Sequence, residues 1–175
     1  MPKCPARSFH KRAPEHIPEA LRPALEPILE QIASLTEGIR QYDRKLETLC
    51  QEHYPETQLL RQVEGVGPLT ALTFVLTLED PYRFERSRSV GAYLGLVPAM
   101  DQSGDRNPQK RISKEGEEML RKLLVGSAHY ILGPFGSDSD LRRHGEKIAS
   151  GGGKNAKKRA AVAVARKLAV LLHRL

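Results

Sequence analysis

Apolar residues recur alternately four and three positions apart between Leu21 and Leu49. The members of this series are Leu21, Leu25, Ile28, Ile32, Leu35, Ile39, Tyr42, Leu46 and Leu49. A heptad seam sustained for about four heptads predicts a long helix that packs along one face against another helix. Because proline is tolerated at the first helical position, we expect regular helix from about Pro27 onwards. Two interpretations stay open: packing within the chain, or pairing between chains that makes a homo-oligomer through residues 21–49.

The residues on both sides of this seam break the helical pattern. Residues 1–20 contain three prolines among the first 14 positions, scattered basic residues and no apolar periodicity, which predicts a disordered arm. The stretch 51–57, with Pro55, predicts the end of the long helix. We therefore assign residues 21–56 to a coiled-coil helix and residues 57–175 to a compact helical domain.

A glycine-containing motif, VEGVGPLTA, opens this second domain at residues 63–71. Gly65 and Gly67 allow a tight turn around Val66 and bring backbone N–H groups close to a phosphate, while Pro68 opens a helix whose N-terminus adds its positive dipole end. The residues expected to face the core from that helix are Leu69, Leu72, Val75 and Leu76. The pattern is typical of a helix-hairpin-helix, which grips nucleic-acid backbone without reading sequence. A plain turn between two helices is the alternative.

The rest of the second domain is predicted to be helical. Ser87 is a favourable N-cap for a short helix through Tyr93. Longer helices are expected over about 117–132 and about 156–175, and residues 133–155 are predicted to be a polar linker that contains glycines. Since no stretch alternates apolar and polar residues as a strand does, the sequence predicts an all-α fold: a long heptad-patterned helix followed by a compact helical domain.

Each of the two longer helices has an apolar stripe. In the first, the expected buried residues are Leu120, Leu123, Leu124, Ala128 and Ile131. Arg121 and Lys122 are expected to point outward from that helix. In the last helix, the expected buried residues are Val162, Val164, Ala165, Leu168, Ala169, Leu171 and Leu172. The glycines before Lys154 are not a phosphate-binding P-loop, because the GxxxxGK[ST] spacing is absent.

The net charge of +7 is unevenly distributed. Residues 1–100 hold 12 Lys and Arg against 13 Asp and Glu, whereas residues 101–175 hold 16 against 8. A basic half of this kind favours a polyanion as partner, because Lys and Arg neutralise phosphates and release counterions. A solvated basic surface is the alternative. The basic residues expected to contact DNA are Arg106, Lys110, Arg111, Lys114 and Arg121.

A serine lies in the loop that precedes this basic segment. Residues 99–108 contain Ser103 followed by Gly104. Because Ser-Gly is a common turn dipeptide, these two residues alone do not identify a nucleophile.

Cysteine usage and hydropathy indicate the compartment in which the protein is expected to act. Cys4 and Cys50 stand far apart in unlike contexts and form no metal or redox spacing, so reduced thiols are the simplest interpretation. No stretch approaches the roughly 18 apolar residues of a membrane span. The sequence therefore predicts a soluble, cytoplasmic protein without a membrane partner.

From about Leu60 to Leu175, covering about two-thirds of the chain in order, these motifs resemble the C-terminal domain of the DEDD (Piv-type) transposases and DNA invertases, whose insertion-sequence members are guided by a bridge RNA. The matching blocks are VEGVGPLTA at 63–71, ED-P-RF at 79–84, AYLGLVP at 92–98, SG at 103–104, RISKEG at 111–116, LRKLL at 120–124 and GK-N-AKKRAAVAVARKLA in the last helix. A coiled-coil insertion ahead of this domain is usual in the family.

The resemblance implies a DNA recombinase in which the Ser103 hydroxyl attacks a phosphodiester and forms a covalent phosphoserine linkage. It also implies DNA and a structured guide RNA as partners. Family members pair this domain with an N-terminal RuvC-like domain that carries four metal-binding carboxylates, and the residues before Leu21 do not supply one. We therefore expect a truncated member, inactive alone, with no cofactor in this chain and Mg²⁺ only together with a RuvC-like domain.

A serine hydroxyl is a poor nucleophile, so the attack needs Mg²⁺ on carboxylates, positive groups, or both. The positive groups expected near Ser103 are Arg106, Lys110, Arg111 and Lys114. Asp101 and Asp105 flank the serine but make a poor metal site by themselves. Two other readings stay open beside the recombinase: a non-catalytic nucleic-acid-binding and dimerisation module, and an inactive remnant.

Overall fold

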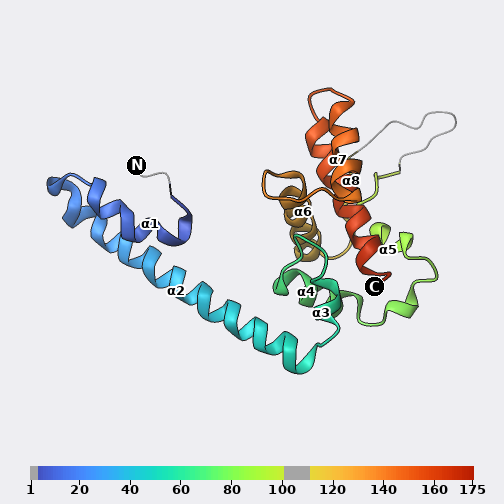
Figure 1. Ribbon diagram of the computed structural model, residues 1–175, viewed down its shortest axis with the longest axis horizontal. Coiled ribbons are helices and arrows are strands. Elements are labelled where there is room, and N and C mark those ends of the chain that lie inside the picture. Colours follow the sequence, from blue (N-terminus) through green and yellow to red (C-terminus); the bar gives the residue numbers. More distant parts are fainter. Residues whose placement is uncertain (1–3, 101–110) are drawn as a thin grey trace. The chain divides into compact units, whose positions relative to one another are not determined.

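The computed structural model describes residues 4–100 and 111–175 and divides the chain into two compact units, Met1–Leu49 and Cys50–Leu175 (Figure 1). The all-α prediction is confirmed. Over the described ranges the elements are helices, and the β-type pairing among them is one isolated bridge between Pro98 and Ile112. None of the helices in those ranges is long and apolar enough to cross a membrane.

The first unit begins with helix α1 (Ala6–Arg12), followed by 3-10 turns at Ala13–His16 and Glu19–Leu21. These short helices correct the prediction of a disordered arm at residues 6–16 and 19–20. The physical reason is local, because the segment between Pro5 and the 3-10 turn carries no helix breaker, and a proline is acceptable at the N-cap where no helical N–H bond is lost.

Helix α2 (Arg22–His53) follows, and it starts earlier than predicted. The expectation that regular helix begins at about Pro27 was wrong. Pro23 falls in the first turn, where a missing N–H costs nothing, and the helix continues through Pro27. Helix α2 ends at His53, ahead of Pro55, within the predicted break.

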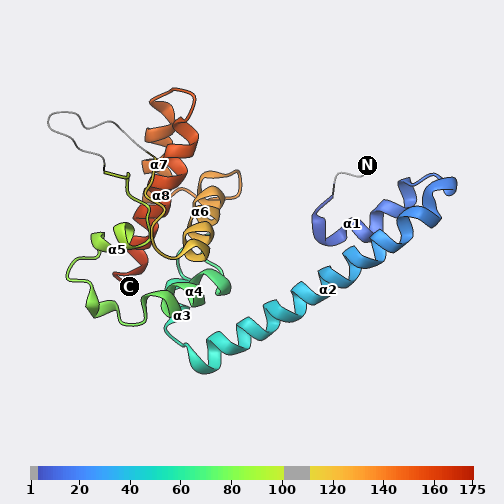
Figure 2. The ribbon, with the colours of Figure 1, turned by 180° about the vertical axis from the view of Figure 1, so that it is seen from behind.

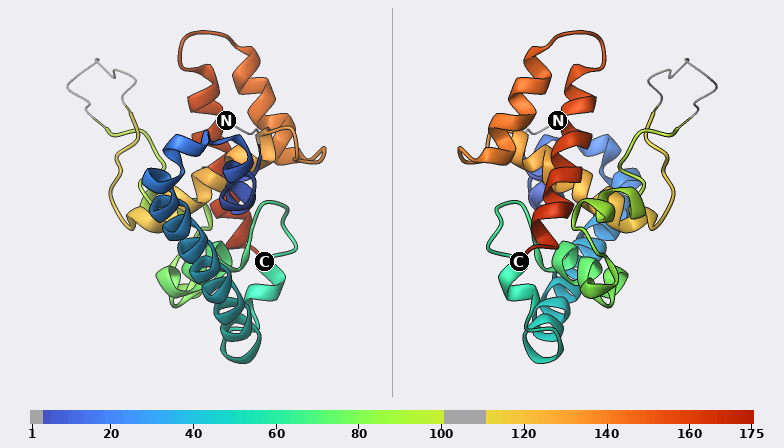
Figure 3. Two further views of the ribbon diagram at one scale, coloured as in Figure 1. Left: turned by 90° about the vertical axis from the view of Figure 1, so that its left-hand side faces the viewer. Right: turned by 90° about the vertical axis from the view of Figure 1, so that its right-hand side faces the viewer.

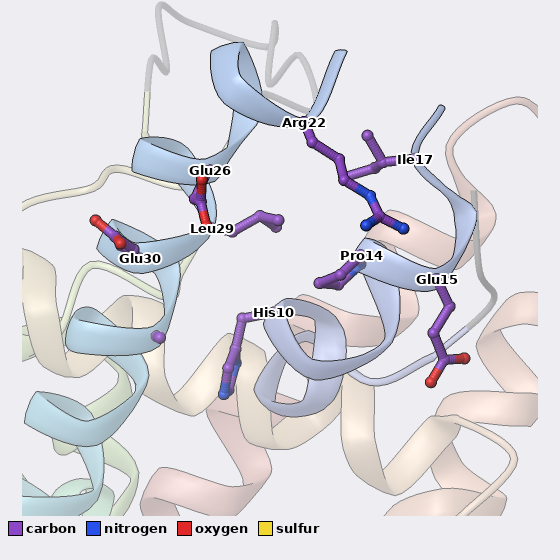
Figure 4. Close-up of a pocket in the computed structure, with 9 residues that line it drawn as sticks. His10, Pro14, Glu15, Ile17, Arg22, Glu26, Leu29 and Glu30 are labelled. Atoms are coloured by element: carbon purple, nitrogen blue, oxygen red, sulfur yellow. The ribbon is translucent and has the colours of Figure 1, made fainter. Parts of the chain in front are cut away.

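A pocket of about 460 Å³ lies between the N-terminal segment and the first turns of α2 (Figure 4). His10 and Pro14 contribute from one wall, and Leu29 from the other. The Glu15 and Glu30 side chains point to opposite sides in Figure 4. Consistent with this, the part of the chain that the structure describes contains no group of three or more His, Cys, Asp or Glu residues that could hold a metal ion.

The heptad series of α2, named here the α2 seam (Leu21 to Leu49), is largely exposed. The large apolar side chains of the α2 seam that are exposed, by 37% to 68%, are Leu21, Ile28, Leu35, Ile39, Tyr42 and Leu49. Leu25, Ile32 and Leu46 are half-buried. The long amphipathic helix predicted from the heptads is therefore present, and most of its apolar face is not covered by described residues.

Over residues 50–100 and 111–175, the second unit contains seven further elements. They are α3 (Thr57–Leu60), α4 (Pro68–Leu78), a 3-10 turn (Pro81–Arg83), α5 (Arg88–Tyr93), α6 (Glu118–Leu132), α7 (Asp140–Ser150) and α8 (Ala156–Leu172). Helix α8 packs against α5, α6 and α7, and α4 packs against α6. Figures 1 and 2 show α7 and α8 side by side as a helical hairpin. The compact unit also includes the last turn of α2, since Cys50 is fully buried and its Sγ lies 3.9 Å from the carbonyl oxygen of Pro68.

The core of this unit is aliphatic, as the composition requires. Its fully buried side chains include Val90, Leu94, Leu96, Leu120, Leu124, Val164 and Leu168. The stripe predicted for the last helix is confirmed at Val164, Ala165, Leu168, Ala169 and Leu172, while Val162 and Leu171 are half-buried. In α6 the predicted stripe is buried except at Leu123, which is half-buried.

Helix α4 begins at Pro68 as predicted, but its buried face differs from the predicted one. Leu69 and Leu76 are 37% and 49% exposed. Leu72 is buried as predicted and Val75 is half-buried, while the other side chains that face the core are Thr70, Ala71, Phe74 and Leu78. The error is one of helical phase: Ala71, Phe74 and Leu78 form an i, i+3, i+7 set that includes the large aromatic side chain.

Helix α7 (11 residues) occupies the middle of the linker predicted for residues 133–155, so that prediction was wrong at residues 140–150. The Ser139 hydroxyl caps the helix by accepting from the Arg142 N–H at 3.2 Å. Arg142 Nη1 donates to the carbonyl oxygens of Ile131, Gly133 and Gly136 at 2.9, 2.7 and 3.0 Å, which fixes the turn that leads into α7.

The packing of α7 on α8 depends on one glycine. A Cβ at Gly145 would lie 2.5 Å from Leu132 Cδ2 and 2.6 Å from Val164 Cγ2, so a side chain there would separate the helices. A glycine that signals a linker to the sequence reader therefore serves close helix packing instead.

Helix α5 starts after Ser87 as predicted, but the Ser87 side chain does not cap it. Its hydroxyl lies 3.1 Å from His173 Nδ1, and His173 Nε2 lies 2.9 Å from the carbonyl oxygen of Pro81. Because that carbonyl can only accept, Nε2 donates to it, and in the neutral imidazole Nδ1 then accepts from the hydroxyl. These bonds tie the end of α8 to the start of α5.

Candidate nucleic-acid interface

The glycine hairpin, residues 61–67, turns between α3 and α4. Gly65 has a φ of +84°, in the left-handed region that favours glycine. Val66 is buried in the core and its N–H donates to the carbonyl of Val63 at 3.1 Å, so the turn is anchored from below. A Cβ at Gly65 would lie 3.2 Å from the carbonyl oxygen of Ser127 and from a ring carbon of Tyr130, so the turn also lies close against α6.

An open groove of about 520 Å³, named here the hairpin groove, lies between the glycine hairpin and α6. Its lining residues are Gly65, Val66, Gly67, Thr70, Lys122, Leu123, Gly126, Ser127 and Tyr130. The hairpin groove thus includes the three residues that the sequence predicted as backbone contacts, Gly65, Val66 and Gly67. It adds a wall from α6 that the sequence did not predict.

The N-terminus of α4 opens on the hairpin groove. The first helical bond of α4 runs from the Ala71 N–H to the Gly67 carbonyl at 3.0 Å. Since Pro68 has no N–H, the amides of Leu69 and Thr70 are the donors of this first turn that have no acceptor inside the helix. They carry the positive end of the helix dipole.

Lys122 supplies a formal positive charge on the opposite wall. Its Nζ lies 2.7 Å from Glu118 Oε1, and the two side chains are 73% and 66% exposed. The hydrogen bond from Lys122, and then its charge, lower the pKa of Glu118. Water screens an exposed i, i+4 pair of this kind, so the pair is weak and Lys122 can exchange Glu118 for a stronger anion.

Glu64 ties the glycine hairpin to the loop between α6 and α7. Its carboxylate accepts from the Ser137 N–H at 3.1 Å and from the Ser137 hydroxyl. These two hydrogen bonds, hydroxyl first, and then the charge of Arg142 lower the pKa of Glu64. The acidic side chain of the motif is therefore engaged in holding the turn in place.

Ser103, Arg106 and Lys110 lie outside the described residues, and so do the flanking Asp101 and Asp105. The two ends of that segment form what we name the loop root, residues 97–99 and 111–113. The Ala99 N–H donates to the Arg111 carbonyl at 2.8 Å, and the Ser113 N–H to the Val97 carbonyl at 2.9 Å. The loop root is therefore an antiparallel pair that brings both ends of the serine segment together.

Arg111 and Lys114, two of the predicted DNA contacts, are exposed at or next to the loop root. Lys114 has a φ of +60°, in the left-handed region, and its N–H donates to the Gly95 carbonyl at 3.2 Å. The tight packing here continues between Gly95 and Gly116, where added Cβ atoms would overlap the opposing backbone. The strained backbone is thus held by interlocking turns.

Arg121 corrects the prediction of an outward DNA contact. Only 9% of this residue is exposed, and its Nη1 donates to the carbonyl oxygens of Leu94, Glu115 and Gly116 at 3.2, 3.2 and 3.5 Å. These carbonyls belong to turns beside the loop root, where no helical or strand N–H pairs with them. The guanidinium supplies the hydrogen-bond donor in its place. Arg121 therefore positions the loop root and does not face solvent.

The spacing of three residues in the sequence could have predicted the α6 wall of the hairpin groove. Lys122, Gly126 and Tyr130 are spaced four apart, so they share one face of the helix. Gly126 is an exposed glycine inside a helix, and a Cβ there would meet nothing within 4 Å. A glycine at such a position keeps the wall flat at the cost of about 1 kcal/mol of helix propensity.

Residues 57–135, which run from α3 through the glycine hairpin and the loop root to the end of α6, match the model of the Transposase IS116/IS110/IS902 family. Among curated proteins, the chain is 34% identical over 102 residues to the transposase for insertion sequence element IS1111A of Coxiella burnetii; the match covers 58% of this chain and 28% of that protein.

Two further curated proteins that the chain resembles are also named as transposases. A protein of Pseudomonas aeruginosa named "Probable family 20 transposase" is 33% identical over 101 residues, 56% of this chain and 30% of that protein. The transposase for insertion sequence element IS1328 of Yersinia enterocolitica is 33% identical over 98 residues, 56% and 29% respectively. The chain thus spans less than a third of the length of these relatives. The family model and the relatives support an insertion-sequence transposase family.

Proposed function

We propose that this chain is a component of an insertion-sequence transposase that binds nucleic-acid backbone in the hairpin groove and supplies Ser103 as the nucleophile for strand cleavage and exchange. The observation that supports this best is the hairpin groove itself, open to solvent and flanked by the N-terminus of α4 and by Lys122. The relatives are transposases of insertion sequences, which makes DNA the expected partner.

The hairpin groove has the chemistry that a phosphodiester needs. Glycines at positions 65 and 67 leave the backbone uncovered, so a phosphate can approach its N–H groups closely. The amides of Leu69 and Thr70 and the dipole of α4 favour an anion at this end of the helix. Lys122 adds a charge at the opposite wall, and the flat face at Gly126 leaves room for the backbone. These contacts position a strand without reading its bases.

Gly126 allows a sharp test of the hairpin groove, because a side chain there meets nothing within 4 Å. Gly126→Gln and Gly126→Glu add side chains of equal size, and both raise helix propensity. We expect Gly126→Glu to weaken binding of duplex DNA at least tenfold relative to Gly126→Gln, because its carboxylate repels the phosphate. Fluorescence anisotropy on the full chain measures both constants. Equal affinities of the two variants would contradict binding in the hairpin groove.

For the chemical step, the Ser103 hydroxyl forms a bond to phosphorus while the bond from phosphorus to the leaving sugar oxygen breaks. The serine loses its proton to water and the leaving oxygen gains one, so the number of phosphodiester bonds is conserved and the reversed step rejoins a strand. Arg111 and Lys114 at the loop root, with Arg106 and Lys110, would stabilise the negative charge of the transition state. No described residues fit the Mg²⁺ of a RuvC-like domain, and no step is assigned to that metal.

A covalent adduct tests the role of Ser103. Full-length chain is incubated with radiolabelled DNA, Mg²⁺ and a RuvC-like domain of the family supplied in trans, and the products are resolved under denaturing conditions. We expect a serine-linked adduct that Ser103→Ala abolishes and Ser89→Ala, a control on the exposed surface of α5, retains. An adduct that persists in Ser103→Ala would assign the nucleophile to another residue.

We also propose that a second copy of this chain covers the α2 seam. A row of large apolar side chains exposed along about four heptads is more than a monomer usually leaves uncovered. A structured guide RNA is the second proposed partner, since its backbone offers the same phosphates as DNA.

A non-catalytic module is the second candidate function, because the hairpin groove and the α2 seam suffice for binding and pairing. In that case Ser103→Ala leaves DNA affinity unchanged and no adduct forms with the wild-type chain under the conditions above.

A further inference from the structure

The net charge of this chain is concentrated in one element. Residues 151–175 contain seven of the 28 Lys and Arg residues and no Asp or Glu. The other 150 residues hold the remaining 21 basic side chains against all 21 acidic ones. The whole excess of +7 therefore comes from α8 and the residues that flank it.

Four exposed basic residues along α8 and at its C-terminal end lie on one side of the helix, whereas the exposed Lys157 and Lys158 in its first turn lie outside that side. At about 100° per residue, Arg159, Arg166 and Lys167 fall within a stripe roughly 100° wide, and Arg174 continues it just beyond the last turn. All four are exposed, whereas the opposite stripe with Val164 and Leu168 is buried in the core. We name these four residues the basic α8 face. The right-hand view of Figure 3 shows α8 along the outer side of the second unit, between α7 and α5.

The basic α8 face differs from Arg40 and Arg44 of α2 and from Arg143 of α7, which have acidic partners. Arg40 and Arg44 both lie within 3.5 Å of Glu37, and Arg143 reaches two aspartates at 2.6 Å. No ion pair between described residues involves the basic α8 face. Solvated helical surfaces usually alternate charges of both signs, so a face with a single sign indicates an external anion.

The neighbourhood of this face supports the same conclusion. The Arg166 stem lies over Gly91 of α5, where an added Cβ would come within 2.9 Å of Arg166 Cγ, so its position on the surface is defined. On the other side, burial and then the charges of Lys167 and Lys147 lower the pKa of His144. Positive charge from α7 therefore adds to that of α8, and His144 does not need to be charged for the face to be basic.

We infer that the basic α8 face is a second nucleic-acid contact, separate from the hairpin groove, that binds the phosphodiester backbone of a duplex. From Arg159 to Arg174 the face spans about 22 Å at 1.5 Å per residue, which matches about six base pairs of a duplex at 3.4 Å each. Half-buried Ala163 lies between Arg159 and Arg166 on the same side, so a backbone can approach closely there.

With contacts at both the hairpin groove and the basic α8 face, one chain would hold two separate stretches of nucleic-acid backbone. Helix α6 packs against both α4, which opens on the hairpin groove, and α8, so it separates the two sites. The inference rests on the proposed function only in taking nucleic acid as the polyanion. DNA and RNA duplexes carry the same phosphates, and the experiment compares the two.

The test uses the full chain and a matched pair of double variants. R166Q/K167Q removes two charges from the basic α8 face, and R40Q/R44Q removes two charges that are paired with Glu37 on α2. Affinities for short DNA and RNA duplexes of one sequence are measured by anisotropy over a salt series. We expect R166Q/K167Q to weaken binding about tenfold or more and to flatten the slope of log K against log salt by about 1.8, or 0.9 per phosphate contact. The kind of duplex, DNA or RNA, whose binding R166Q/K167Q weakens more is the one that the basic α8 face contacts.

R40Q/R44Q is expected to change the slope by less than about 0.5, because those charges are already neutralised. A slope for R166Q/K167Q equal to that of R40Q/R44Q overturns the inference. Gly126→Glu separates the two proposals. If it loses affinity while R166Q/K167Q does not, only the hairpin groove binds. If R166Q/K167Q loses affinity while Gly126→Glu equals Gly126→Gln, the α8 contact stands and the hairpin groove does not.

Discussion

Helices α2 and α8 are both long, and both carry many charged residues on their surfaces, yet a different kind of side chain is exposed along each of them. On α2 the basic residues Arg40 and Arg44 share Glu37, while the apolar side chains of the α2 seam are exposed. On α8 the apolar stripe is buried, and the basic α8 face has no ion pair among the described residues. What a helix leaves unsatisfied indicates the chemistry of the partner: another apolar helix for α2, and a polyanion for α8.

Salt distinguishes these two kinds of contact. Burial of apolar surface contributes about 25 cal/mol per Å² and is not screened, so pairing through the α2 seam should persist or strengthen at high salt. Binding to phosphates is driven by counterion release and weakens steeply with salt. Oligomerisation and nucleic-acid binding of this chain should therefore respond to salt in opposite directions.

The largest effect is expected from a charge placed in the α2 seam. Ile39 is 62% exposed at the middle of the helix, and Ile39→Glu would put a carboxylate twice into the apolar contact of the dimer that we propose. Losing about 1.5–3 kcal/mol per buried side chain predicts a dimer dissociation constant raised at least a hundredfold. Light scattering coupled to size-exclusion chromatography measures the mass, with Gln41→Glu on the polar side of α2 as control. A variant that keeps the wild-type mass would show that the α2 seam is not the contact.

Arg121 provides a contrast with the arginines of α8, because it is buried while they are exposed. Arg121→Met keeps the length of the side chain but leaves the carbonyls of Leu94, Glu115 and Gly116 without their donor. We expect the free energy of unfolding to fall by about 2–4 kcal/mol. Chemical denaturation measures it. The salt slope of DNA binding should stay at the wild-type value under conditions where the variant is folded, and a reduced slope would restore Arg121 as a phosphate contact.

Much of the helical architecture could be predicted from the sequence, because heptads, prolines and apolar stripes report directly on helices. The prediction of the buried stripe of α8 was largely correct for this reason. The errors fell where a residue has two possible roles. Residues 133–155 were predicted to be a linker because they are polar and contain glycines, but Gly145 within them lies where α7 packs closely on α8. That packing depends on Leu132 and Val164 from other elements. Sequence spacing does not show which glycines face a neighbour.

The candidate site was predicted in part. The glycine hairpin was identified because its turn is a local feature, and Gly65 does have a positive φ. Arg121 was expected to point outward because it does not belong to the apolar stripe of its helix, whereas its partners include a carbonyl that a turn distant in sequence brings near. The role of Ser103 stays a prediction.

The smallest effect is expected at Glu64, the acidic residue that anchors the glycine hairpin through hydrogen bonds from Ser137. Its charge is hydrogen-bonded within the fold, whereas the charges of the basic α8 face are exposed. Because the hydrogen bonds from Ser137 lower its folded-state pKa, the anchor stabilises the fold fully above the ordinary glutamate pKa of about 4.3 and is lost as pH falls through the lower folded value. In NMR spectra the Ser137 amide should titrate with a midpoint below 4.3, a value that follows from the direction of the shift. Glu64→Gln should remove this titration and Glu118→Gln, whose partner is Lys122, should keep it. A midpoint at or above the ordinary value would mean that the carboxylate gains nothing from Ser137, and the hairpin groove would then have to be held in shape by Val66 and the packing of Gly65 on α6 alone.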